Sequence, residues 1–261
     1  MKSHHTRAIG RLTARYRADP ACLALILVGS IATGKQRDGS DIDFIAVVTD
    51  DEFARLTAAG QVHILLTEVC DYPGGYAEGK AVKLQFLRAA AERGSEPARW
   101  AFSAARIVFS HIPDLEAILA AIPVYPRHGK AEKIARFYSQ FKIWQGYLDY
   151  AEQHQNPYLT LHASSRIALF AGRLILAHNE ILYPYHKWFM SAVEAAPDKP
   201  VGFTAMLRAF TIQPTASAAE SLRALLDNFM DLERHSSDWI TRFVIDSEWN
   251  WLNSPPPVED A

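Results

Sequence analysis

The chain of 261 residues is long enough for one large domain or two small ones, and its 49% apolar and 21% charged content is ordinary for a globular protein with a hydrophobic core. A formal net charge of −2 provides no basic excess, which argues against wholesale binding to a nucleic-acid backbone. Two cysteines are too few for a disulfide scaffold, no apolar run is long enough to cross a membrane and no apolar leader follows Met1, so we expect a reduced, cytoplasmic protein with no membrane partner.

The first predicted elements are one helix and two strands. Residues 5–18 have apolar side chains at helical spacing, and Asp19-Pro20 ends that helix. Residues 25–28 and 44–48 are apolar, rich in β-branched side chains and bounded by turn residues, so they predict two short buried strands.

Gly29-Ser30 ends the first strand and is a candidate phosphate cradle. Glycine lets the backbone approach a ligand closely or take a positive φ, and Ser30 offers an N–H group and a hydroxyl. If Ser30 caps a short helix over residues 31–35, the N-terminus of that helix favours a phosphate.

Asp41 and Asp43 stand at the start of the second strand. Side chains at positions i and i+2 of a strand project to the same face, so the two carboxylates repel each other unless a cation lies between them. Oxygen ligands suit a hard ion such as Mg²⁺, which normally also needs phosphate oxygens. A phosphate cradle beside this pair suits attack on a metal-bound nucleotide phosphate.

Gly29-Ser30, a spacer over residues 31–40, and Asp41-Ile42-Asp43 resemble the motif of the nucleotidyltransferase superfamily related to DNA polymerase β. Spacer residues similar to the minimal and antibiotic-modifying branches of that superfamily are Ala32, Gly34, Arg37 and Ser40. The resemblance implies transfer of a nucleoside monophosphate from an NTP, with ATP expected, to an acceptor by means of two divalent ions, Mg²⁺ or Mn²⁺. It also implies that both aspartates bind the metal.

The residues that the resemblance assigns to the nucleotide are Gly29, Ser30, Lys35, Arg37 and Ser40. It also implies a third carboxylate on a neighbouring strand, as a metal ligand or as the base that takes the proton of the acceptor. Residues 62–72 predict a third strand, which contains Glu68 and Asp71. Asp71 is preferred because it lies at the end of the strand, where functional residues collect, and Glu68 is the alternative.

Three further elements are predicted in this half of the chain. Residues 49–59 form a helix with Thr49 as its N-cap, residues 82–93 form a helix that ends at Gly94, and residues 104–110 complete the sheet.

The loop signals of this half lie at residues 73–75 and at Gly79-Lys80. Lys80, Arg93 or Arg99 is a candidate for contact with the triphosphate, because cationic side chains stabilise transferring phosphoryl groups. A surface turn with local ion pairs explains residues 92–99 equally well, so both interpretations stay open.

The hydrophobic periodicity of the chain changes after Asp114, where strand-like runs stop and patterns of amphipathic helices begin. We expect an α/β nucleotidyltransferase domain over residues 1–122, with a small mixed sheet flanked by helices. An all-α helical bundle is predicted over residues 123–252, and a disordered tail over residues 253–261. The helices predicted within the bundle cover residues 130–152, 158–178 and 216–243, with one short helix in 195–215.

Residues 183–188 gather aromatic side chains, a cation and an imidazole. Tyr185, His186 and Lys187 are candidates for binding a ring-bearing or polyhydroxylated substrate, although a packed corner between helices explains the cluster as well.

Three functions compete. The first is modification of a small hydroxylated molecule such as an aminoglycoside-like antibiotic, with an NTP and that acceptor as the only partners. The second is a protein-modifying AMP transferase or an antitoxin-type nucleotidyltransferase, and the third is a nucleotide-binding protein without catalysis. The sequence leaves the acceptor open, and also the choice between a monomer and a homodimer.

Overall fold

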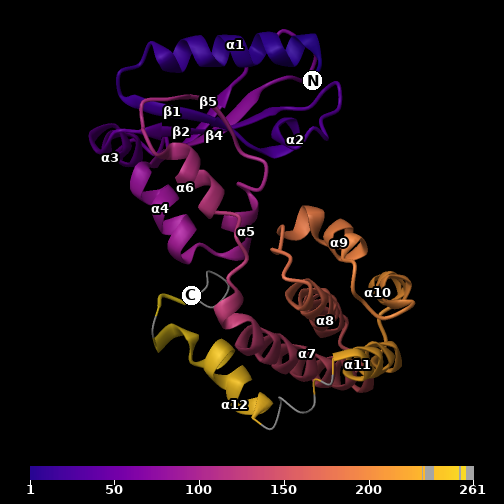
Figure 1. Ribbon diagram of the computed structural model, residues 1–261. Coiled ribbons are helices and arrows are strands. Elements are labelled where there is room, and N and C mark those ends of the chain that lie inside the picture. The colour runs from indigo at the N-terminus through magenta and orange to yellow at the C-terminus, as the bar shows by residue number, and fades with distance from the viewer. Residues whose placement is uncertain (231, 233–237, 253, 257–261) are drawn as a thin grey trace. The chain divides into compact units, whose positions relative to one another are not determined.

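The computed structural model describes residues 1–230, 232, 238–252 and 254–256. The chain divides into two compact units, Met1–Val124 and Tyr125–Ala261. Figure 1 shows a sheet with helices in the first unit and helices throughout the described part of the second. The predicted combination of a small mixed sheet with an all-α region is confirmed.

The first unit contains, in chain order, α1 (Ser3–Arg17), β1 (Cys22–Leu27), α2 (Gly29–Ala32), β2 (Ile42–Val48), α3 (Asp50–Ala58), β3 (His63–Leu66), β4 (Ala77–Lys83), α4 (Leu84–Arg93), α5 (Glu96–Trp100), β5 (Arg106–Ser110) and α6 (Leu115–Ala121). The strands form one sheet in the order β3-β4-β2-β1-β5. β2 and β4 run parallel, and the other neighbouring strands run antiparallel. The parallel pair is central to the site described below.

Two apolar layers cover the sheet. α1 buries Ala8 and Leu12 against one face, where Phe44 of β2 lies. α4 and α6 pack on the other face, which holds Ile45 and Val47 of the same strand. Figure 1 shows α1 across one side of the sheet with α4 and α6 on the other. Because side chains alternate along a strand, Asp43 projects on the face of α4 and α6.

The predicted loop at Gly79-Lys80 is wrong, because both residues lie within β4. A Cβ atom at position 79 would fall 2.5 Å from ring carbons of Phe44, so the glycine makes room for this ring. The third strand is also shorter than predicted, since β3 ends at Leu66. Gly79 therefore marks close packing within strand β4 rather than a turn.

The sequence correctly predicted helix α3 from its local capping signal. α3 begins after Thr49, whose hydroxyl accepts a hydrogen bond from the backbone N–H of Glu52 at 3.4 Å. This is the predicted N-cap, and it satisfies one of the free N–H groups of the first turn.

The second unit contains η1 (Arg127–Gly129), α7 (Lys130–Gln153), α8 (Pro157–His178), α9 (His186–Ala195), α10 (Phe203–Ile212), α11 (Ala216–Met230), α12 (Trp239–Phe243), the π-helical turn η3 (Val244–Glu248) and η4 (Asn250–Leu252). In place of the single helix predicted over residues 216–243, α11 and α12 are separate, and residues 231 and 233–237 between them lie outside the described residues. Of the predicted tail, residues 253 and 257–261 also lie outside them.

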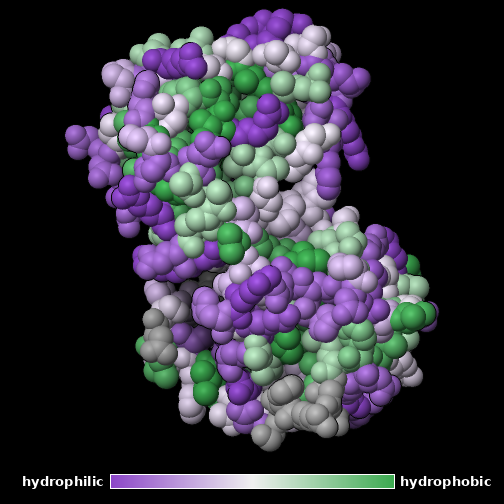
Figure 2. Space-filling model, viewed as in Figure 1, coloured by the Kyte–Doolittle hydropathy of each residue, from purple (hydrophilic) through white to green (hydrophobic). Residues whose placement is uncertain are grey.

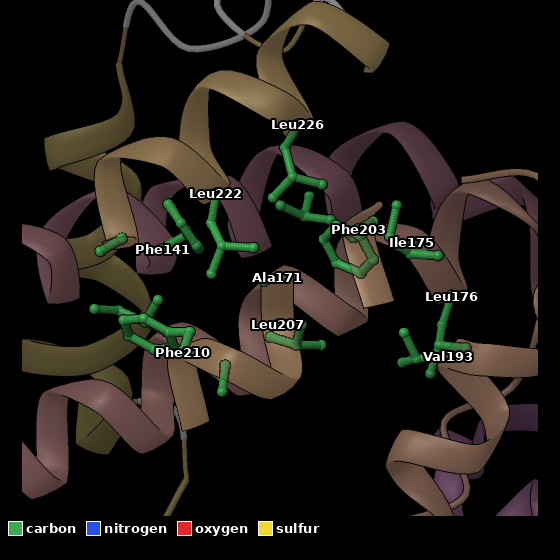
Figure 3. Packing of buried hydrophobic residues seen from close by; sticks show 14 of the residues in the cluster. Phe141, Ala171, Ile175, Leu176, Val193, Phe203, Leu207, Phe210, Leu222 and Leu226 are labelled. Carbon is green, nitrogen blue, oxygen red and sulfur yellow. The ribbon is translucent and has the colours of Figure 1, made fainter. Parts of the chain in front are cut away.

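The core of the second unit forms where α7, α8, α10 and α11 meet. Figure 3 shows Phe141 of α7, Phe210 of α10 and Leu222 of α11 within one buried cluster. In Figure 2 the viewed face of this unit is mainly hydrophilic, with hydrophobic residues scattered on it. Within the described residues, no helix has the length and apolar content needed to span a membrane.

Candidate active site

The bend after β1 lies directly against Asp43 of β2. The backbone N–H of Val28 donates a hydrogen bond of 3.0 Å to the carbonyl oxygen of Asp43. Gly29 has a φ of +67°, and a Cβ atom there would lie 1.9 Å from Oδ2 of Asp43. Only glycine therefore fits both the backbone conformation and the space beside the carboxylate.

We expect Gly29→Ala to destabilise the protein and to displace the carboxylate of Asp43. The left-handed backbone conformation alone costs a side chain about 1–2 kcal/mol, and the contact with Asp43 adds to that. Gly34→Ala is the matched control, because Gly34 has a φ of +74° but open space around it. Urea unfolding should show a larger loss of stability for Gly29→Ala, and equal losses would contradict the role of the contact.

Ser30 lies inside α2 and does not cap it. Val28 occupies the N-cap position without a capping side chain, so the predicted cap at Ser30 is wrong. The Oγ atom of Ser30 is buried and has no hydrogen-bond partner within the part of the chain that the structure describes. A buried hydroxyl without a partner is unfavourable, so a further hydrogen-bond partner would stabilise it.

Three carboxylates share this edge of the sheet. β2 and β4 pair in parallel with Asp43 beside Glu78, so both side chains project to the same face. Asp41 precedes Asp43 by two residues and comes just before β2. A hydrogen bond to Asp41 and the charge of its carboxylate raise the pKa of the Tyr76 hydroxyl, and the charges of Glu78 and Asp43 act in the same direction.

This carboxylate set fits a metal that arrives with a nucleotide. Among the described residues, no three His, Cys, Asp or Glu side chains converge as a preformed metal centre. Mg²⁺ is typically bound through one or two carboxylates together with substrate phosphates, rather than by a cage made of protein alone. Asp41, Asp43 and Glu78 offer carboxylate oxygens, which are the type of ligand that such an ion accepts.

The predicted third carboxylate, Asp71, does not belong to this group. Asp71 accepts hydrogen bonds from Arg7 Nε at 3.0 Å and from Arg11 Nη2 at 2.9 Å, and the bond from Arg7 is the main cause that lowers the pKa of Asp71. The alternative, Glu68, pairs with Arg15 of α1 at 3.0 Å. Both carboxylates thus bind the helix on the face of the sheet opposite Asp43.

Glu78, unlike Asp71, lies in register beside Asp43. It is absent from the predicted site because residues 79–80 carry a loop signal. The alternation of buried Ala77, Gly79 and Ala81 with Glu78 and Lys80 is the sequence signal that indicates a strand with an outward carboxylate. Nε2 of His63 on β3 lies 2.9 Å from Oε1 of Glu78, so this imidazole contacts the Glu78 carboxylate directly.

The polar residues predicted to contact the nucleotide lie at two places in the first unit, on β4 and in the connection between α2 and β2. Lys80 is exposed, two residues after Glu78 on the same face of β4. Lys35 and Arg37 are also exposed, in the connection between α2 and β2. Ser40 acts within that connection, because its Oγ atom accepts a hydrogen bond of 2.8 Å from the backbone N–H of Arg37. Ser40 therefore shapes the turn before Asp41.

Arg99 is a structural residue, and its predicted contact with the triphosphate is wrong. Its side chain is buried, and its guanidinium donates hydrogen bonds to the backbone carbonyl groups of Ala91, Glu92, Gly94, Ile122 and Val124. The guanidinium closes the end of α4 onto the segment after α6, so its donors are occupied within the fold.

We expect Arg99→Met to lower the free energy of unfolding by about 3 kcal/mol or more, because several buried carbonyl groups lose their donor. Arg93→Met is the control, since Arg93 is exposed and its ion pair with Glu92 is 3.9 Å long. Urea unfolding should show no measurable change for the control. A small effect of Arg99→Met would contradict the structural role.

The aromatic cluster of the second unit is divided between core and surface. Tyr183 is buried, and its hydroxyl lies 3.1 Å from Nδ1 of His186. Tyr185, His186 and Lys187 are exposed at the start of α9, and Tyr185 has a φ of +65°. Tyr183 therefore belongs to the packed core, while the other three remain candidates for contact with a substrate.

Among the comparisons with known proteins, the family match concerns the first unit. Residues 18–87 match the family model described as a nucleotidyltransferase domain, and this range contains Gly29, Asp41, Asp43 and Glu78. No curated protein matches the chain. A solved structure of a nucleotidyltransferase-like protein from Exiguobacterium sibiricum aligns with 94% of this chain and 78% of its own chain, at 11% sequence identity and a TM-score of 0.45. The family match confirms the predicted resemblance, and the chain therefore carries a nucleotidyltransferase domain at residues 18–87.

Proposed function

We propose that the protein transfers AMP from ATP to a hydroxyl group of a small acceptor, such as an aminoglycoside-like antibiotic, in the presence of Mg²⁺ or Mn²⁺. The observation that carries the proposal is the close approach of Gly29 to Asp43, with Glu78 in register beside Asp43. This arrangement combines a phosphate-binding bend with a carboxylate group, which nucleotidyl transfer requires.

Each residue of the site has a separate role in this proposal. Asp41 and Asp43 hold the metal, and Gly29 with Ser30 binds phosphate oxygens of the nucleotide. Mg²⁺, when bound, neutralises charge on the phosphates and makes the transferred phosphorus more electrophilic. Lys80 is exposed on the face of Glu78 and attracts the negatively charged triphosphate.

Glu78 is proposed as the third carboxylate, as a metal ligand or as the general base. The acceptor oxygen forms a bond to the α-phosphorus while the bond from that phosphorus to the bridging oxygen breaks, and pyrophosphate leaves. As a base, the Glu78 carboxylate takes the proton of the acceptor hydroxyl. Tyr185, His186 and Lys187 of the second unit are proposed as a separate binding surface for a polyhydroxylated ring, which their aromatic, imidazole and ammonium groups suit.

The test is a screen of hydroxylated acceptors with labelled ATP and Mg²⁺, read out as pyrophosphate release and as the mass of the product. The Asp43→Asn variant provides the background. One acceptor that gains the mass of AMP above that background supports the proposal. Label that appears on protein instead would favour a protein-modifying transferase, and binding of MgATP without any release of pyrophosphate would favour a nucleotide-binding protein without catalysis.

A further inference from the structure

A cavity of about 440 Å³ lies within the second unit, between α7, α8 and the α12–η3 segment. Its volume falls in the range of small-molecule pockets. Figure 1 shows α12 running beside the long helix α7. Leu159 of α8, Ile240 and Phe243 of α12 line it with apolar side chains. The cavity belongs to this unit alone and takes no part in the proposed nucleotide site.

Gly146 keeps this cavity open. It lies in the middle of the 24-residue helix α7, where glycine is less favourable than alanine by about 1 kcal/mol. A Cβ atom at this position would meet nothing within 4 Å, so no neighbouring atom requires the glycine. Since Gly146 lines the cavity, any larger side chain would occupy the open space itself.

The π-helical turn η3 places two residues against the same cavity. Val244 and Glu248 both line it, and the backbone N–H of Trp249 donates to the carbonyl oxygen of Val244 at 2.9 Å, as a π turn requires. Such turns are rare and frequently occur at functional sites. α7 holds the turn in place by hydrogen bonds from Arg136 to Asp246, at 2.7 Å, and from Gln140 Nε2 to Ser247 Oγ, at 2.8 Å.

The polar groups of the cavity favour a cation. Among the described residues, Glu248 is the only charged side chain in the lining. Tyr147 and Tyr150 also line the cavity, and these residues are 43% and 51% exposed. Aromatic faces and a carboxylate both attract an ammonium group, while the apolar walls attract a hydrocarbon or an aromatic ring.

We propose that this cavity binds a small hydrophobic molecule that carries an ammonium group. The apolar part lies over Gly146 between α7 and α8, and the ammonium group pairs with Glu248. An anion of the same shape should bind more weakly, because the carboxylate of Glu248 repels it. This site goes beyond the proposed nucleotidyl transfer and does not depend on it.

The test uses the full chain and three probes of matched shape: 4-phenylbutylamine, 4-phenylbutan-1-ol and 4-phenylbutyrate. We expect isothermal titration calorimetry near neutral pH to show that the amine binds about tenfold more tightly than the alcohol, and the acid most weakly. Glu248→Gln should remove the advantage of the amine and leave the alcohol unchanged. Asp149→Asn, which changes the net charge equally on α7 outside the cavity, should alter nothing.

Gly146→Leu should weaken all three probes by at least tenfold, because the side chain fills the cavity while leucine favours a helix. If this variant unfolds, Gly146→Ala replaces it, with an expected rise in Tm and a smaller loss of affinity. The proposal is overturned if the amine fails to bind, if the acid binds as tightly as the amine, or if both Gly146 variants leave binding intact. Self-association of the chain that Gly146→Leu abolishes, without binding of the amine, would instead assign the surface to a second copy.

Discussion

Asp43→Asn is expected to lower the rate of nucleotidyl transfer by about three orders of magnitude or more, with the fold intact. The substitution removes a negative charge next to Gly29 and beside Glu78, where the metal and the triphosphate are proposed to bind. A metal ion supplies much of the charge stabilisation in phosphoryl transfer, so loss of one ligand reduces the rate far more than the stability. Asp41→Asn should act in the same direction. Pyrophosphate release with the acceptor found in the screen measures the effect.

Binding of Mn²⁺ together with ATP, followed by electron paramagnetic resonance, gives a second measurement that does not need the acceptor. Both variants should bind the metal–nucleotide complex more weakly, while the urea unfolding midpoint stays close to that of the parent protein. Glu68→Gln is the matched control, since Glu68 pairs with Arg15 on α1. Full transfer activity in both aspartate variants would refute the proposed site.

Glu78→Gln is expected to lower the rate of transfer by about 10²- to 10³-fold. The amide keeps the shape of the side chain and its place on β4, but it neither takes a proton nor binds a metal as strongly as a carboxylate. Glu78 lies in register with Asp43 on the parallel neighbouring strand, so the effect should appear in the rate of the chemical step. Single-turnover transfer with the identified acceptor is the appropriate measurement.

Two control variants test whether the Glu78 carboxylate itself is required for transfer. His63→Ala removes the contact of 2.9 Å between the imidazole and Glu78 but keeps the carboxylate, so it should retain far more activity than Glu78→Gln. Asp71→Asn should leave the rate unchanged and affect only the bonds to Arg7 and Arg11. If Asp71→Asn proves as damaging as Glu78→Gln, the choice of third carboxylate is wrong.

The limits of prediction from the sequence are clearest at this third carboxylate. Asp71 has the local features expected of a functional residue, because it lies in a polar segment before a turn. Its partners Arg7 and Arg11 are more than 50 residues away along the chain, and no local pattern indicates that α1 lies over this segment. Gly79 has the local features of a loop residue, but it lies in a strand. The ring of Phe44 on a neighbouring strand requires a glycine there.

The sequence by itself determined the elements that depend on near neighbours along the chain. The apolar strand around Asp43 and the N-cap of α3 at Thr49 both follow from spacing within a few residues. The nucleotidyltransferase domain also follows from such a short motif, as the family match over residues 18–87 confirms.

Only the tertiary structure decided which distant groups meet. The register of β2 with β4 places Glu78 beside Asp43, and the closure of α4 onto the segment after α6 buries Arg99. Both results depend on how apolar faces pack across the sheet, where many pairings satisfy the same local pattern and only the complete set of contacts selects one.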